Sequence, residues 1–513
     1  MEMFSFLKKL SWRWNQAGVY CLYLVSHLLL LTAMPVFADE AIYIRWAQLI
    51  IDDWQRYSLF SLNDGKTPIF IWVMVPFLKF VTNQLLAGRL LAVVVGLFQV
   101  FLIKELVKVF GGKRKAQLIS MVLTVILPFW FFYHRIALMD GLMTLFISYV
   151  VLTLVKLAKH LEKEKTAFAF NRYTIFFTVG AGVSFGLAIL SKLPGLFLSP
   201  VFVLIAAFPF TTNHLRLSIT KFFWIGLAGV IGISLFLLLK LHPAFAQLFL
   251  RGGNFTYSIG ELLAGDWVNS IRNIPRFSGW LIFYLSPTVI LFPLAGLLDK
   301  KIAKKVGFLI LSAALFCGPF VVFGKTVYPR YLLPSAIFLT VATGLVSENW
   351  LEKRQKIQLI TLGLLGLTFL WSMYNIVITF VNINDVPFVA LDREQYQTEW
   401  SAGYGVRESV DFIQEQAKQG KVVVATEGYF GTLPDGILLY LHNQDVANIE
   451  VFGIGEPIRS VPSEFVMKAT NAHSAYIMVN SHRMMTNDPR LTKVKSFPRP
   501  YNAPSFDIYE FKQ

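Results

Sequence analysis

Residues 89–110 read RLLAVVVGLFQVFLIKELVKVF, and the next five residues, 111–115, read GGKRK. The first stretch is long enough to cross a bilayer as a helix, because a span needs about 20 mostly apolar residues. The second stretch is a short basic loop, of the kind that collects on the cytoplasmic side of a membrane protein. The pairing of an apolar run with a basic connection recurs along the chain and predicts a polytopic membrane protein.

The composition of the whole chain agrees with this prediction. Of its 513 residues, 55% are hydrophobic and 15% are charged, whereas a soluble domain averages about 45–50% apolar and about 25% charged residues. The net charge of +16 would suit a nucleic-acid-binding protein only if the basic residues shared one folded face. They lie instead in loops between apolar runs, so no nucleic-acid partner is expected. Cys21 and Cys317 both lie in apolar runs, which excludes a disulfide framework and a cysteine-based metal site.

Eleven apolar runs are predicted to span the membrane. One further run, 68–81, is shorter and contains Pro76. If it crossed the bilayer, GGKRK and several later basic loops would face outward, so we expect it to be an interfacial helix. The N-terminus is then cytoplasmic and the C-terminus lies outside the cell membrane. The predicted spans are 19–37, 89–110, 116–133, 141–158, 174–191, 193–210, 222–240, 279–298, 306–323, 331–347 and 358–381.

The sequence changes character after the last span. Residues 383–513 alternate between amphipathic and continuous apolar stretches, which predicts helices and buried strands in turn. We therefore expect two domains, a transmembrane domain over 1–382 and an α/β domain over 383–513 on the outer face. The predicted fold is an α-helical polytopic membrane protein of about 11 transmembrane helices, with outer-face interfacial helices and a C-terminal α/β soluble domain. The expected helices are 406–418 and 433–441, and the expected strands are 421–426, 449–453, 475–479 and 506–511.

Two acidic features lie in the segments predicted to face outward. Asp39 and Glu40 follow the first span and precede a stretch with helical spacing of apolar residues. One carboxylate would serve to cap that helix, but a pair is more than capping requires. Asp140 ends a short outer loop that begins with His134 and Arg135. An ion pair between Arg135 and Asp140 would close this loop, and a functional role for the same residues is compatible with it.

Basic residues are rare in the outward segments, so each one needs a reason. Lys66 follows the turn signal Asp64-Gly65, Lys192 lies in a hairpin between two spans, and Arg330 precedes Tyr331 in a connection between late spans. Taken singly, each charge is explained by contact with lipid headgroups. Taken together, they indicate a site for an anionic ligand, because lysine and arginine are the usual partners of phosphate.

Two longer outward segments carry no definite motif. The loop 241–278 contains Arg251 among several charges and is long enough to cover a site. The stretch 391–404 contains Tyr396 and Trp400, which could stack on sugar rings, but packing in a domain core or against the membrane is the favoured interpretation. No phosphate-binding loop, dinucleotide-binding glycine pattern or H-E-x-x-H sequence occurs in the chain, so a nucleotide-using cytoplasmic enzyme is not supported.

The order of these motifs is similar to that of the GT-C superfamily of membrane glycosyltransferases. An Asp-Glu pair follows the first span, a Gly-Lys-x-Pro turn precedes the interfacial helix, and a Lys-x-Pro-Gly hairpin and a late Pro-Arg-Tyr come after them. The resemblance covers about residues 15–380. It is strongest to the bacterial branch of protein O-mannosyltransferase-like and aminoarabinose-transferase-like enzymes.

This resemblance implies a polyprenyl-phosphate sugar donor and inverting transfer of a hexosyl or pentosyl group to a lipid, glycan or protein acceptor on the outer face of the cell membrane. Asp39 would be the general base, with Glu40 assisting it or orienting the acceptor. Asp140 would bind the sugar or a metal ion such as Mg²⁺ or Mn²⁺, whose involvement stays open. The donor phosphate would be bound by Lys66, Lys192, Arg330 and Tyr331, and the acceptor or sugar by His134 and Arg135.

Two other functions are compatible with a polytopic membrane protein. A transporter or flippase of a polyprenyl-linked or other charged lipid would need many helices, but such proteins place ionisable residues near the middle of the bilayer. Here the charges lie at the predicted outer boundary. A non-catalytic anchor for the outer domain would need one helix, which makes eleven difficult to explain. The sequence therefore favours an enzyme.

Overall fold

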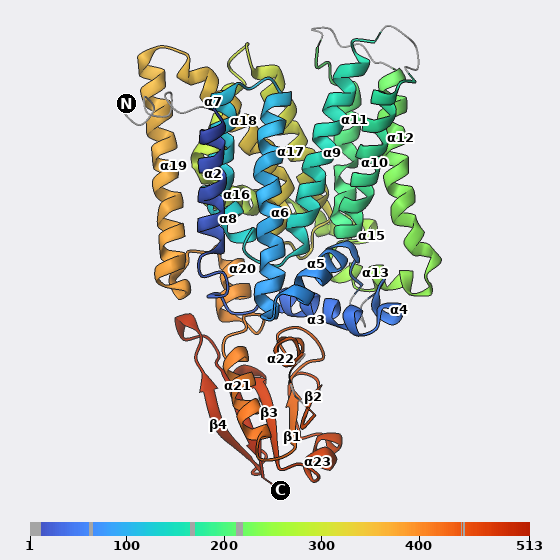
Figure 1. Cartoon of the computed structure of the whole chain (residues 1–513), viewed down its shortest axis with the longest axis vertical. Coiled ribbons are helices and arrows are strands. Elements are labelled where there is room, and N and C mark those ends of the chain that lie inside the picture. Colours follow the sequence, from blue (N-terminus) through green and yellow to red (C-terminus); the bar gives the residue numbers. More distant parts are fainter. Residues whose placement is uncertain are drawn as a thin grey trace.

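The computed structural model describes residues 12–60, 65–164, 170–211, 219–442, 444 and 447–512. Most of these residues form a bundle of long helices, and a small mixed domain sits at one end of the bundle (Figure 1). The main bundle elements are α2 (Trp12–Leu28), α6 (Gln84–Val109), α7 (Arg114–Ile126), α8 (Pro128–Tyr133), α9 (Met139–Leu161), α10 (Arg172–Ser191), η1 (Leu193–Leu198), α11 (Ser199–Ala207), α12 (Ile219–Leu237), α16 (Trp267–Gly296), α17 (Ala303–Phe323), α18 (Leu333–Leu351) and α19 (Gln355–Val381).

Each of the eleven predicted spans overlaps a helical segment, although the first predicted span, 19–37, is helical only as far as Leu28. Among the described residues, eight helical stretches are long and apolar enough to cross a membrane. The remaining three predicted spans form shorter pieces: α2 has 17 residues, α7 ends before Pro128, where α8 starts, and η1 bends into α11. Proline favours the first turn of a helix but cannot continue one from the preceding residue without strain. Pro128 therefore explains why the helix is interrupted between α7 and α8.

Short helices cover the end of the bundle that faces the small domain (Figure 1). The run that we expected not to cross forms the 12-residue helix α5, and α3 follows the first span as predicted. The short helix α4 follows α3, and the other elements at this end belong to the loop before α16 and to the connection before α18. The elements are α3 (Ala38–Asp52), α4 (Trp54–Tyr57), α5 (Ile69–Phe80), η2 (Leu238–Leu241), η3 (Pro243–Ala246), α13 (Gln247–Leu250), α14 (Gly252–Phe255), α15 (Ile259–Glu261), η4 (Leu262–Asp266) and η5 (Pro329–Leu332).

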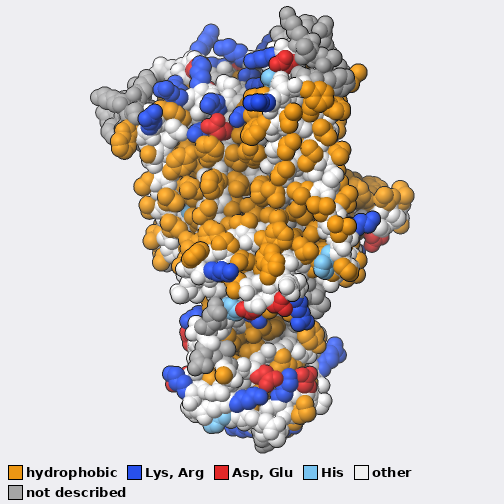
Figure 2. All heavy atoms as spheres, turned by 45° about the vertical axis from the view of Figure 1, so that its right-hand side comes forward, with side chains coloured by type: hydrophobic (Ala, Val, Ile, Leu, Met, Phe, Trp, Pro, Cys, Tyr) orange, Lys and Arg blue, Asp and Glu red, His pale blue; other side chains and the backbone are white. Residues whose placement is uncertain are grey.

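The basic loops gather at the opposite end of the bundle, beyond a broad apolar band (Figure 2). Contacts between the loops support this arrangement. The Lys113 ammonium lies 3.0 Å from a carboxylate oxygen of Glu352, and the Lys353 ammonium lies 2.5 Å from a carboxylate oxygen of Asp299. These loops were predicted to share one side of the membrane because of their charge, and the fold brings them to one end.

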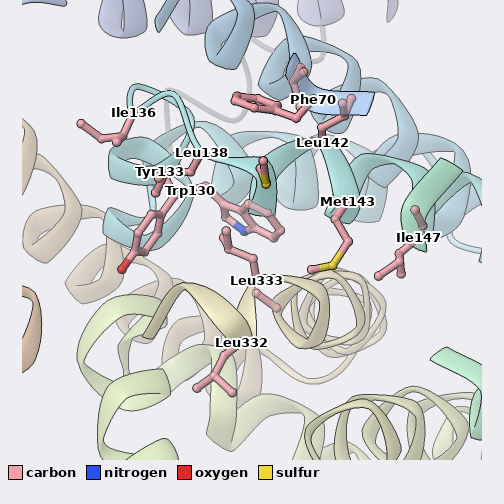
Figure 3. Packing of buried hydrophobic residues seen from close by; sticks show 14 of the residues in the cluster. Phe70, Trp130, Tyr133, Ile136, Leu138, Leu142, Met143, Ile147, Leu332 and Leu333 are labelled. Atoms are coloured by element: carbon pink, nitrogen blue, oxygen red, sulfur yellow. The ribbon is translucent and has the colours of Figure 1, made fainter. Parts of the chain in front are cut away.

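Apolar side chains fill the space between the helices just beneath the small domain. Trp130 on α8, Met143 on α9 and Leu333 on α18 meet there and are all fully or nearly fully buried (Figure 3). The indole nitrogen of Trp130 donates to the hydroxyl of Thr340 at 3.3 Å, so its one polar atom is satisfied. This packing fixes the helix ends that carry the site.

The small domain is built on a five-stranded sheet with the order β2-β1-β3-β5-β4. The first three strands are parallel, and β4 and β5 are antiparallel additions. The structure confirms the four predicted strands. The elements are α20 (Ala390–Arg393), η7 (Glu394–Thr398), α21 (Val406–Ala417), β1 (Val422–Thr426), α22 (Asp435–Leu441), β2 (Ile449–Gly453), α23 (Ser463–Ala469), β3 (Ser474–Asn480), β4 (Leu491–Phe497) and β5 (Phe506–Phe511), with short turns η6 (Ile383–Asp385), η8 (Ser481–Arg483) and η9 (Pro500–Asn502).

Helices cover both faces of this sheet, which explains why β1 is apolar throughout. Val424 packs in the same cluster as Ile413 of α21, whereas Val423 packs with Phe465 of α23. Strand β4 was not predicted from the sequence. It is an exposed edge strand that carries lysines, so it lacks the continuous apolar run of a buried parallel strand.

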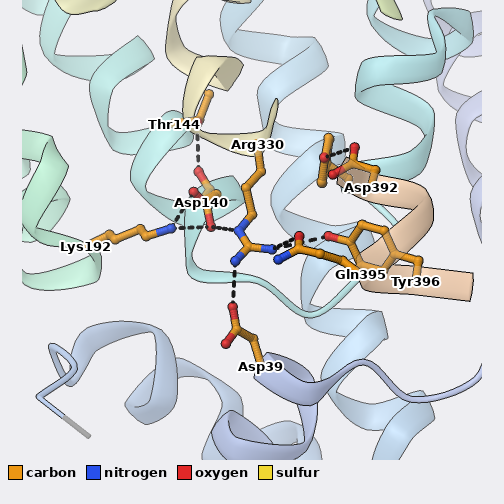
Figure 4. Close-up of polar contacts among 9 residues, drawn as sticks. Asp39, Asp140, Thr144, Lys192, Arg330, Asp392, Gln395 and Tyr396 are labelled. Carbon is orange, nitrogen blue, oxygen red and sulfur yellow. Dashed lines mark hydrogen bonds and ion pairs between the residues drawn. The ribbon is translucent and has the colours of Figure 1, made fainter. Parts of the chain in front are cut away.

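The sheet domain is joined to the bundle through α3. The side-chain amide of Gln48 donates to the carbonyl oxygen of Leu439 at 2.9 Å, and the backbone of Phe37 forms a bridge with Ala402. The start of α3 therefore lies between the bundle and the small domain, and the carboxylate of Asp39 points from it toward the ends of the bundle helices (Figure 4).

Candidate active site

Arg330 lies at the centre of a buried network of alternating charges (Figure 4). Its guanidinium Nη2 donates to the Asp39 carboxylate at 2.9 Å, and its Nε lies 3.9 Å from the Asp140 carboxylate. The side chain of Arg330 is only 5% exposed. An arginine buried to this extent needs charged or polar partners on several sides, because burying an unpaired ion costs on the order of several kcal/mol. The three residues come from three separate segments.

Lys192 completes the network on the side of Asp140. Its ammonium lies 2.7 and 2.8 Å from the two oxygens of Asp140, which is almost fully buried. The same ammonium lies 4.4 Å from the centre of the Tyr331 ring. Lys192 adopts an extended backbone at the end of α10, and Asp140 lies in the first turn of α9. An acidic residue is favoured there because the amino end of a helix carries partial positive charge.

The surroundings shift the proton affinity of two members of the network. Burial works to raise the pKa of Asp39, but the nearby cations Lys66, Arg330, Lys192 and Arg251 outweigh it and hold that pKa below its ordinary value. Burial lowers the pKa of Lys192 to about 8, although the contact with Asp140 opposes this change. Asp39 is therefore a carboxylate at neutral pH, and Lys192 retains most of its charge there.

The network lines two adjoining cavities of different character. A polar chamber of about 280 Å³ contains Asp39 and Arg330 in its wall. An apolar groove of about 310 Å³ runs past Leu193, Phe197 and Phe320. Five residues belong to both walls, and three of them are cationic: Lys66, Lys192, Arg251, Phe255 and Tyr331. A molecule with an apolar tail and an anionic head would thus have its head between the two cavities.

Of the residues predicted to form the site, Glu40 lies apart from this network. Both of its oxygens contact the buried guanidinium of Arg89, at 2.9 and 2.7 Å. It also accepts hydrogen bonds from the backbone amides of Phe37 and Ala137. Glu40 closes the capping box at the start of α3 and ties that helix to the loop before α9. Its contacts are those of a residue that holds Asp39 in place.

Arg135 and His134 also lie outside the two cavities. Arg135 donates to four backbone carbonyl groups at the end of α2, those of Ser26, His27, Leu29 and Leu30, at 2.8 to 3.1 Å. These carbonyls have no partner within the helix, so the arginine acts as its C-terminal cap. His134 is buried against the rings of Trp130 and Tyr23. The structure shows no ion pair between Arg135 and Asp140 among the described residues.

The structure adds residues to the chamber that no sequence motif marked. Arg251 comes from the loop before α16 and lies over the ring of Phe430, at 5.2 Å from its centre. The segment before the small domain supplies Gln395, whose carbonyl oxygen accepts from Arg330 at 3.0 Å, and Trp400. Trp400 was noted in the sequence as an aromatic that suits sugar stacking. Arg251 was noted only as one of several charges in a long loop, and Gln395 was not singled out, because the place of both depends on distant segments meeting.

A divalent cation does not fit this donor set well. Among the residues that the structure describes, no group of three or more His, Cys, Asp or Glu side chains is arranged to hold a metal ion. Asp39 and Asp140 are each paired with a cation of the protein, and further cations line the same chamber. Where the chamber meets the groove, the charged residues shared by both walls are all cations, namely Lys66, Lys192 and Arg251, and such a place favours an anion.

Comparison with known proteins gives one family match and several structural likenesses. Residues 61–249 match the family model described as dolichyl-phosphate-mannose-protein mannosyltransferase. No sequence among the curated proteins matches the chain. Two solved structures of ArnT from Cupriavidus metallidurans, one in the apo state and one bound to undecaprenyl phosphate, share the fold with a TM-score of 0.59 and 15% identity over 96% of this chain and 97% of theirs.

The oligosaccharyltransferase of Archaeoglobus fulgidus is a second structural relative. Its apo structure aligns with a TM-score of 0.54 and 12% identity over 93% of this chain and 70% of that one. Another of its structures is a complex with Zn and sulfate. At these identities the likeness establishes the fold. The family model matches residues 61–249, and the chain shares the fold of ArnT and of the archaeal oligosaccharyltransferase.

Proposed function

We propose that this protein transfers a sugar from a polyprenyl-phosphate donor to a hydroxyl or amine of a lipid, glycan or protein acceptor, with Asp39 as the general base. One observation carries the proposal: Asp39 lines a polar chamber that shares three cationic residues with an apolar groove. A lipid-phosphate sugar has the three parts that this arrangement fits, namely an apolar chain, an anionic link and a polar ring.

The apolar groove would take the first units of the polyprenyl chain. The phosphate would lie among Lys66, Lys192, Arg251 and Arg330, and the sugar would project into the chamber toward Asp39. Cations fixed in a water-poor site stabilise the negative charge that grows on the leaving phosphate as its bond to the sugar breaks. The ArnT structure bound to undecaprenyl phosphate supports a donor of this class.

Asp39 and the leaving phosphate would compete for Arg330. In the structure, the Asp39 carboxylate accepts a hydrogen bond from this arginine at 2.9 Å. When the donor phosphate also binds this guanidinium, the positive charge of Arg330 stabilises the Asp39 carboxylate less. The affinity of Asp39 for a proton therefore rises. Asp39 then accepts the proton of the acceptor group while that group bonds to the anomeric carbon and polyprenyl phosphate departs from the opposite side. One displacement of this kind inverts the anomeric centre.

The acceptor would enter on the side of the small domain. That wall of the chamber is made by Glu394, Glu399, Trp400 and Phe430. Carboxylates accept hydrogen bonds from hydroxyl or amine groups, and aromatic faces pack on the apolar face of a sugar ring. The basic loops lie at the other end of the bundle, so the positive-inside rule would put the N-terminus in the cytoplasm and this wall outside the cell membrane.

The proposal is tested with purified protein in lipid nanodiscs, a panel of undecaprenyl-phosphate sugars and a panel of lipid, glycan and peptide acceptors, by measuring the release of undecaprenyl phosphate together with the glycosylated acceptor. We expect Asp39→Asn to reduce the rate by about 10²- to 10⁴-fold, the usual contribution of a positioned base, and to leave binding of undecaprenyl phosphate intact. Asp299→Asn is the matched control, because Asp299 lies among the basic loops and contacts Lys353.

Unchanged turnover in Asp39→Asn would contradict the assignment of Asp39 as the general base. Scrambling of fluorescent lipids by the same protein in liposomes, without any sugar transfer from the panel, would instead indicate a transporter. The two assays use one preparation, so they separate the two functions directly.

A further inference from the structure

The segment 390–401, which we call the strap, crosses the candidate site between the bundle and the small domain. It consists of α20 and the π-helical turn η7, followed by three residues. Its far end is fixed to the start of α3, because the amide of Ala38 donates to the carbonyl oxygen of Ser401 at 3.0 Å. The strap therefore contacts the same helix turn that carries Asp39.

Asp392 anchors the near end of the strap in the bundle. One of its carboxylate oxygens accepts from the hydroxyl of Tyr133 on α8 at 2.7 Å and from that of Tyr284 on α16 at 2.5 Å. Asp392 is fully buried. The neighbouring ring of Tyr396 packs against Phe132 and Phe37, at 4.8 and 4.7 Å between ring centres. The near end of the strap is thus held in the bundle by Asp392 and by the ring of Tyr396, and one partner of that ring, Phe37, also lines the chamber.

Gln395 extends from this anchored strap to Arg330 (Figure 4). Its side-chain oxygen accepts from guanidinium Nη1 at 3.0 Å, and the hydroxyl of Tyr396 lies 3.5 Å from the same nitrogen. The opposite nitrogen, Nη2, donates to Asp39. The arginine is therefore held between a carboxylate on one side and a neutral amide on the other.

We infer that Gln395 is a positioning residue that holds the guanidinium of Arg330 in the chamber without cancelling its charge; the inference rests on the proposed role of Arg330 toward the donor phosphate. Two carboxylates already lie near this arginine. A third would leave little net positive charge for an anionic ligand, whereas an amide oxygen supplies the same hydrogen bond and adds no charge.

The test measures binding of undecaprenyl phosphate to the full-length protein in nanodiscs, together with thermal stability. We expect Gln395→Ala to weaken binding about tenfold, because a hydrogen bond to a charged group is lost. We expect Gln395→Glu to weaken binding at least as much. Glutamate keeps a hydrogen-bond acceptor beside Arg330, but its negative charge offsets the positive charge of the guanidinium. Gln397→Ala is the matched control: Gln397 is a buried glutamine of the same strap whose amide donates only to backbone carbonyls.

Each outcome has a separate meaning. If Gln395→Glu binds undecaprenyl phosphate as tightly as the unaltered protein, Gln395 serves packing alone and the inference is wrong. If Gln397→Ala weakens binding as much as Gln395→Ala does, the effect belongs to the strap's stability and not to the contact with Arg330. If the unaltered protein binds no undecaprenyl phosphate, the proposed function fails as well. A failure confined to the Gln395 variants would leave that function standing.

Discussion

Arg330 and Asp39 meet at 2.9 Å although 291 positions separate them in the chain. The pair joins the turn before α18 to the first turn of α3. It brings the residue proposed to accept a proton against one proposed to bind the donor phosphate. Under the proposed function one guanidinium would serve both, so occupancy of the donor site and the basicity of Asp39 would be coupled through a single side chain.

Arg330→Lys should therefore impair transfer strongly although it keeps the charge. A lysine ammonium cannot reach Asp39 and Gln395 from opposite sides as a planar guanidinium does. We expect a loss of about tenfold or more in donor affinity, since charge-assisted hydrogen bonds are the strong ones. Binding of undecaprenyl phosphate and the rate of its release from a sugar donor would be measured in parallel. A variant that matched the unaltered protein in both would show that charge alone suffices.

Binding of the lipid phosphate should weaken as the pH rises through about 8. The pKa of Lys192 is lowered to about 8, so its ammonium is charged below that pH and neutral above it. Lys192→Arg should move the decline to higher pH, because arginine stays protonated throughout the accessible range. The measurement is the affinity for undecaprenyl phosphate between pH 6 and 10. An identical profile for both proteins would assign the decline to another group.

Glu40→Gln should destabilise the protein without abolishing catalysis in what remains folded. Glu40 and Arg89 are both fully buried and make two short contacts. Removing one partner of such a pair costs about 3–5 kcal/mol, because the other charge is left uncompensated. The check is the midpoint of thermal unfolding in detergent, with Asp39→Asn for comparison, since Asp39 is partly exposed. A stable but inactive Glu40→Gln protein would restore the direct catalytic role predicted from the sequence.

Asp392→Asn should raise stability at neutral pH. Burial raises the pKa of Asp392 from 3.8 to about 6, against the opposing hydrogen bonds from Tyr284 and Tyr133. The folded state thus favours the protonated form. The stability that this group contributes is fully present below pH 4 and is lost as the pH rises through 6. An asparagine at this position has no charge to bury, so it avoids that loss, and its side-chain oxygen can still accept hydrogen bonds from both tyrosine hydroxyl groups.

The expected gain for Asp392→Asn at pH 7 is at most about 3 kcal/mol, since each pKa unit corresponds to about 1.4 kcal/mol. Thermal unfolding of both proteins between pH 4 and 7.5 provides the measurement. Curves that stay parallel over this range would contradict the shifted pKa. A lower stability of the variant at every pH would mean that the asparagine cannot satisfy both hydroxyl groups.

Much of the fold follows from local sequence. Apolar length predicted the helices, and the charge of the connections predicted which loops lie together; the contact between Lys113 and Glu352 shows that two of these loops do. Buried parallel strands such as β1 were also predicted, because both of their faces are apolar. The exposed edge strand β4 was missed because it carries lysines and has no continuous apolar run.

The candidate site was predictable only in part. Asp39, Asp140, Lys192 and Arg330 were selected as charges at costly positions, and the structure brings them together. The same reasoning also selected Arg135, which instead satisfies backbone carbonyls. A charge at a helix end looks the same in sequence whether it faces a ligand or a neighbouring helix. The difference depends on tertiary packing, which local patterns do not contain.

The two cavities share cationic residues but differ in lining, one mostly apolar and one with charged residues around Asp39. Under the proposed function, the carrier lipid would arrive sideways from the bilayer and the acceptor from the aqueous side, so neither would block the other's entrance. The spent carrier would leave by the path along which it came. Turnover would then depend on how quickly the membrane removes undecaprenyl phosphate from around the protein, and added undecaprenyl phosphate would inhibit in competition with the donor but not with the acceptor.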